Sequence, residues 1–138
     1  MKKSVYVLAI LLAQVIASKS FAVEKSFSCN SGDLNVKIET EPVDPEDAAG
    51  TLDDERADQA YNLFQSDEFA APKGTTLYQI DGKGDGDTDF YFVAIPDSLE
   101  TARKNSKLVI QLIEKSDRAA TSANPMGIIR NNVTCAVE

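Results

Sequence analysis

Apolar residues recur along this chain in short segments with the spacing of β-strands. From Leu34 to Glu39 apolar and polar residues alternate, which is typical of a strand with one buried face. The segment Phe90–Ile95 is apolar on both faces and predicts a central strand buried on both sides. Further strands are predicted at 75–80, 108–113 and 128–137. Strands with such short connections predict a mainly β or α+β fold, built as a small antiparallel β-sandwich or barrel.

An acidic insert, about residues 39–70, separates the first predicted strand from the others. One helical face of the insert would carry four apolar residues, Ala57, Ala60, Tyr61 and Phe64. The preceding residues Thr51–Asp54 resemble a helix capping box with Asp in place of Glu. We therefore expect one short helix at about residues 52–65, whose aromatic side chains make core contacts.

The first residues have the three parts of a secretory signal peptide. Lys2 and Lys3 form a basic head, Val5–Ile16 is an almost wholly apolar run, and Ser20–Ala22 is a small-x-small cleavage site. The apolar run is much shorter than the roughly 20 residues that a membrane-spanning helix needs. We expect residues 1–22 to be removed and residues 23–138 to form a single exported domain, in the periplasm or outside the cell, without membrane insertion.

The net charge narrows the choice of partners. The chain has 14 basic and 22 acidic residues, and loss of Lys2, Lys3 and Lys19 with the signal peptide would change the net charge from −8 to −11. Such a surface repels phosphate backbones and anionic lipids, so nucleic acids and membranes are poor candidate partners. A basic protein or divalent cations would be attracted. The alternative is that the charge only keeps an exported protein soluble.

The two cysteines, Cys29 and Cys135, lie near the two ends of the predicted domain. In an oxidising compartment such a pair is expected to form a structural disulfide that closes the domain. Two cysteines without any histidine are too few for a zinc site of the usual kind.

A Gly- and Asp-rich segment follows the strand predicted at 75–80. Its alternating carboxylates could supply the hard oxygen ligands of a calcium ion, and the candidate ligands are Asp81, Asp85, Asp87 and Asp89. An EF-hand is excluded, because Phe90 stands where that loop needs Gly. The alternative is a Gly-rich connection between two strands of a hairpin, kept soluble by its acids.

The acidic insert is a candidate surface for a basic protein partner, because complementary charge steers association. The candidate contact residues are Glu41, Asp44, Glu46, Asp47, Asp53, Asp54 and Glu55. The alternative is that these residues form a solvated insert without a partner.

Catalysis is not expected from this composition. The absence of His excludes Ser-His, Cys-His and His-metal sites, and among 22 acids no pair is distinguished as a glycosidase pair. The sequence therefore predicts a small exported non-catalytic protein, a binding or inhibitor-type module like those that act on cationic hydrolases. The alternative function is a calcium-stabilised structural or adhesive domain. The oligomeric state stays open.

Overall fold

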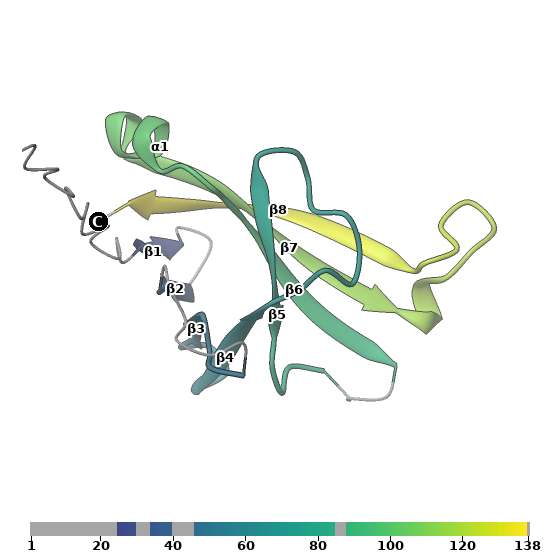
Figure 1. Cartoon of the computed structure of the whole chain (residues 1–138). Helices are drawn as coiled ribbons and strands as arrows, with labels where there is room; N and C mark the ends of the chain where they lie inside the picture. The colour runs from purple at the N-terminus through teal and green to yellow at the C-terminus, as the bar shows by residue number, and fades with distance from the viewer. Residues whose placement is uncertain (1–24, 30–33, 40–45, 85–87, 138) are drawn as a thin grey trace, which may run out of the picture.

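The computed structural model describes residues 25–29, 34–39, 46–84 and 88–137. This part of the chain is mainly β, with antiparallel strands and one short α-helix (Figure 1). The strands are β1 Lys25–Cys29, β2 Leu34–Ile38, β3 Gly50–Asp54, β4 Gln59–Gln65, β5 Thr75–Ile80, β6 Asp89–Pro96, β7 Lys107–Ser116 and β8 Ile128–Val137. The predicted signal peptide, residues 1–22, lies outside the described residues.

Each strand pairs with the next along the chain, and β8 returns to β1, so the sheet curls into a barrel. The pairing is uneven around the ring. The β1–β8 and β4–β5 ladders each join three residue pairs, whereas the β7–β8 ladder joins nine. As a result β6, β7 and β8 continue beyond one end of the small barrel as a twisted extension (Figure 1). The predicted mainly β, antiparallel class is confirmed.

The interior of the barrel is the larger core. The predicted alternation in β2 is confirmed, because Leu34, Val36 and Ile38 are buried in this core while Lys37 is exposed. One end of the barrel is filled by the segment around the helix α1 (Glu100–Asn105). Leu99 and Ala102 from this segment join the interior cluster. No helix within the described residues is long and apolar enough to cross a bilayer.

A second, smaller core lies on the outer face of β5, β6 and β7. Leu77, Phe92, Ala94 and Ile113 are buried there. Phe69, from the connection between β4 and β5, covers them, and its ring meets the Phe92 ring edge-on at a centroid distance of 5.0 Å and an interplanar angle of 76°. Strand β6 is therefore buried on both faces, as its apolar sequence predicts.

The helix expected at 52–65 is wrong, because this segment is the β3–β4 hairpin. Leu52, Tyr61 and Leu63 are buried at strand spacing, and pairing with β2 and β5 satisfies the backbone on both sides. The Asp54 side chain accepts a hydrogen bond from the Ala57 backbone N–H (3.3 Å), so it caps a turn and not a helix. Asp58 completes the reversal with a φ of 50°, a left-handed conformation that Asp tolerates.

Strands β1 and β8 bring the two cysteines together in register. Cys29 lies directly opposite Cys135. Opposed residues of an antiparallel pair have Cα atoms about 4.5–5.5 Å apart, which is within the range that a disulfide spans. The Cys135 side chain is fully buried, but that of Cys29 lies outside the described residues. The bond itself therefore stays a prediction.

Candidate functional site at the open end of the barrel

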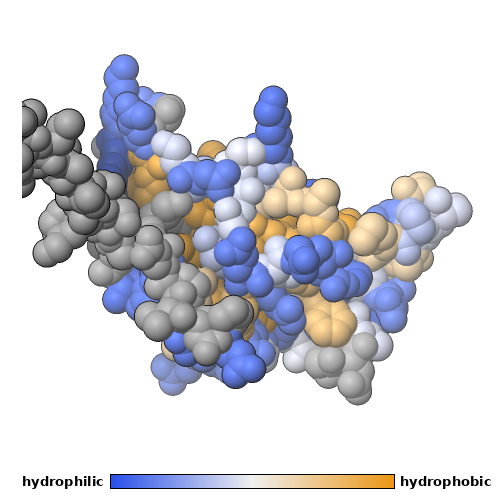
Figure 2. Space-filling view, viewed as in Figure 1, coloured by the Kyte–Doolittle hydropathy of each residue, from blue (hydrophilic) through white to orange (hydrophobic). Residues whose placement is uncertain are grey.

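The end of the barrel opposite α1 is open. A hollow of about 440 Å³ lies there, between the β3–β4 turn and the extension of β7 and β8. Its lining, which we call the mouth, consists of Leu34, Asp54, Arg56, Ala57, Leu112 and Val133. Leu34, Leu112 and Val133 belong to the interior core, so the floor of the mouth is apolar. Figure 2 shows apolar surface in the middle of the visible face with hydrophilic residues around it.

A second hollow of about 300 Å³ adjoins the mouth and is acidic. It is lined by Asp53, Asp54, Glu55, Asp58, Gln59 and Ala60, all from the β3–β4 hairpin. Asp53, Glu55 and Asp58 are exposed. Asp54 lines both hollows, so an apolar opening and a cluster of carboxylates share one wall.

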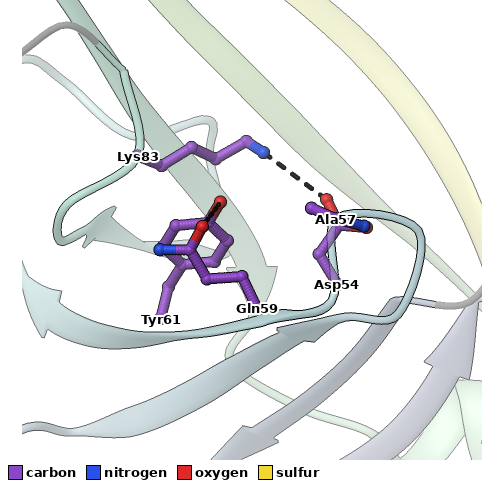
Figure 3. A network of polar contacts seen from close by, with 5 residues as sticks. All are labelled: Asp54, Ala57, Gln59, Tyr61 and Lys83. Atoms are coloured by element: carbon purple, nitrogen blue, oxygen red, sulfur yellow. Dashed lines mark hydrogen bonds and ion pairs between the residues drawn. The ribbon is translucent and has the colours of Figure 1, made fainter.

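Lys83 reaches this shared wall from the β5–β6 connection (Figure 3). Its Nζ atom lies 3.6 Å from Asp54 Oδ2. The same ammonium group lies 5.1 Å from the centre of the Tyr61 ring and 5.4 Å from that of Tyr91, both within the range of a cation–π contact. The Tyr61 hydroxyl donates to Gln59 Oε1 (3.0 Å), which holds the ring in place.

A short hydrogen-bond chain ties the acidic hairpin to its neighbours. Ser28 Oγ donates to Asn35 Oδ1 (2.6 Å), and Asn35 Nδ2 donates to Glu55 Oε1 (3.1 Å). Glu55 is thus linked through β2 to β1. This chain connects one wall of the acidic hollow to two neighbouring strands.

The structure divides the predicted partner-binding residues. Asp53, Asp54 and Glu55 come together beside the mouth, whereas Glu46 and Asp47 precede the other end of β3. Glu41 and Asp44 lie outside the described residues. Glu46 and Asp47 are exposed, and the five-residue strand β3 separates them from the turn. Their role in partner binding stays a prediction.

The predicted calcium ligands are only partly described. Asp81 is exposed after β5, and Asp89 is half-buried at the start of β6. Asp85 and Asp87 lie outside the described residues. Among the side chains that the structure describes, no group of three or more His, Cys, Asp or Glu residues converges as a metal site. The calcium hypothesis stays a prediction.

Comparison of the chain with protein-family models, with curated proteins and with solved structures found no match. Function is therefore inferred from the geometry of the mouth and its acidic wall.

Proposed function

We propose that the protein is a non-catalytic binding module that captures a basic protein partner at the mouth. The observation that supports this most is the shared wall at Asp54. On one side of it lie the exposed carboxylates Asp53, Glu55 and Asp58, and on the other an apolar floor. A Lys or Arg side chain has matching parts, because its charged end suits the carboxylates and its apolar stem suits the floor.

The two surfaces would contribute differently to binding. Carboxylates at the rim accelerate encounter with a basic partner and select against acidic ones. Burial of apolar stems and neighbouring side chains at the mouth would supply most of the lasting affinity. The class of partner is a cationic exported protein, such as a basic hydrolase, for which a bound module would act as an inhibitor.

The exported setting and the disulfide belong to this proposal. N-terminal sequencing of the protein purified from its natural source is expected to begin at Val23. Non-reducing peptide mapping is expected to join the peptides that contain Cys29 and Cys135. A mature chain that retains its first residues and has free thiols would contradict both expectations.

The binding test uses immobilised protein and a panel of small basic proteins, with lysozyme among them and an acidic protein of similar size as reference. The triple variant Asp53→Asn, Glu55→Gln and Asp58→Asn removes the acidic wall. Its association rate at low salt is expected to fall about tenfold. The rate for the parent protein is expected to fall steeply as salt rises.

A matched triple variant, Asp47→Asn, Asp67→Asn and Asp117→Asn, changes the net charge equally at exposed positions away from the mouth. Its association rate is expected to fall less than about twofold. Equal losses in both variants would show that net charge alone attracts the partner. Absence of binding across the basic panel would contradict the proposal itself.

A further inference from the structure

We propose that Tyr61, Tyr91 and Asp54 form a cage for an alkylammonium ligand, and that Lys83 occupies this cage in the free protein. Two aromatic rings and a carboxylate are the groups that bind quaternary and methylated ammonium ions in proteins. Here all three surround one ammonium nitrogen, at 5.1 and 5.4 Å from the ring centres and 3.6 Å from the carboxylate oxygen.

The walls of the cage belong to the barrel scaffold. Tyr61 is buried in β4, and Tyr91 lies in β6 and packs against the interior core. Asp54 ends β3 and is held by its hydrogen bond to the Ala57 backbone N–H. The side chain of Asp54 is only 14% exposed, so its charge acts in a poorly solvated place. The walls of the cage are thus attached to three strands of the barrel.

The occupant is held more loosely than the walls. Lys83 enters from a connection between strands on a flexible four-carbon stem, and its side chain is 28% exposed. Its distance of 3.6 Å from Asp54 is longer than a direct charged hydrogen bond. Partly exposed pairs of this kind contribute little to stability, so an incoming cation that makes further contacts at the mouth can replace Lys83.

The position of the cage indicates which cation would compete. Asp54 lines both the mouth and the acidic hollow, so a lysine or methylated lysine that enters either one meets the cage wall. This step rests on the proposed function, whereas the ammonium site itself does not. While Lys83 occupies the cage, an external cation cannot bind there, so the apparent affinity for that cation is reduced to the fraction of time that the cage is empty. Lys83 would therefore exclude cations that bind only weakly.

The first test is chemical rescue. Lys83→Ala is expected to lower Tm by about 2–4 °C, and about 50 mM n-butylammonium chloride is expected to restore most of that loss by binding the empty cage. The same concentration of sodium chloride is the solvent control. Lys73→Ala removes an exposed lysine elsewhere, and its Tm is expected not to respond to the amine.

Ring variants identify the site of rescue. In the Lys83→Ala background, Tyr61→Phe keeps the ring and is expected to keep the rescue, whereas Tyr61→Leu is expected to abolish it. Rescue that persists in the leucine variant would overturn the cage. So would equal effects of butylammonium and sodium chloride.

A second measurement needs no variant. Reductive methylation with ¹³C-formaldehyde labels the lysines and keeps their charge, and the Lys83 methyl signals are expected upfield because two rings face them. Added butylammonium is expected to move these signals toward the positions of the other lysines. Signals without an upfield shift, or unaffected by the amine, would overturn the proposal.

The two proposals fail separately. Lys83→Ala is expected to bind a basic protein at least about fivefold more tightly than the parent, against less than about twofold for Lys73→Ala. If a basic protein binds at the mouth but butylammonium neither rescues nor displaces, the cage is wrong and the binding module stands. If butylammonium rescues but no basic protein binds, the cage stands and the binding module is wrong.

Discussion

The second core predicts an energetic coupling between two aromatic residues that are distant in the sequence. Phe92 is 1% exposed, and Phe69 covers it edge-on at 5.0 Å from the connection between β4 and β5. Phe92→Ala is expected to cost about 3–5 kcal/mol, which could unfold a domain of ordinary stability of about 5–15 kcal/mol. Phe92→Leu keeps most of the volume and is expected to cost about 1–2 kcal/mol.

A double-mutant cycle with Phe92→Leu and Phe69→Leu isolates the contact. An aromatic pair contributes about 0.5–1.5 kcal/mol beyond its buried area. The double variant is therefore expected to lose less free energy of unfolding than the sum of the losses in the two single variants, by that amount. Urea unfolding followed by circular dichroism measures each free energy of unfolding. Val109→Ala, at an exposed position of β7, is the additive control. Additivity of Phe69 and Phe92 within about 0.3 kcal/mol would show that the connection does not pack on the sheet.

Three further predictions test other parts of the structure. Gly50→Ala is expected to lower the free energy of unfolding by about 3 kcal/mol or more, because a Cβ atom there would lie 2.1 Å from the Lys37 carbonyl oxygen; a urea midpoint like the parent's would contradict the close approach of β2 and β3. Burial, and secondarily the charge of Asp97, raise the pKa of Tyr78 above its ordinary 10.0. The folded state therefore favours the neutral phenol, so the stability that the neutral Tyr78 contributes is present below pH 10 and is lost as pH rises through the folded pKa. In Tyr78→Phe the urea midpoint is expected to decline less steeply at alkaline pH than in the parent. Equal declines in the two proteins would refute the assignment of this pH dependence to Tyr78. The calcium hypothesis predicts that saturating calcium raises Tm and that Asp81→Asn reduces the rise; no shift in the parent would remove it.

The strands with the clearest hydrophobic patterns are those that the sequence predicts best. Strand β5 has the predicted bounds, 75–80, and β2 follows its alternation. Strand β6 is buried on both faces because the chain adds an outer layer through Phe69. Such patterns predict the structure well because the apolar side chains that form the pattern are also the ones whose burial stabilises the strand.

The β3–β4 hairpin could not be predicted from the sequence, because its hydrophobic pattern is ambiguous. Its apolar residues fit a helical face and a strand face almost equally, and Ala57 and Ala60, which favour the helical interpretation, are exposed. The acidic cluster at Asp53–Glu55 was predictable from charge alone. The cage was not, because Lys83 and Asp54 are far apart in the sequence and meet only when two turns lie at the same end of the barrel.

The ladder between β1 and β8 has a consequence for biosynthesis. Its register joins Cys29 to a partner more than 100 residues later, at Cys135. While the chain is being synthesised, β1 can pair with β2 along one edge, but its other edge stays unpaired until β8 has been made. Closing so long a loop late makes folding slow, and the waiting edge is a natural binding site for chaperones and a point of entry for aggregation. The rate at which the barrel closes is therefore expected to depend on when β8 becomes available to pair with β1.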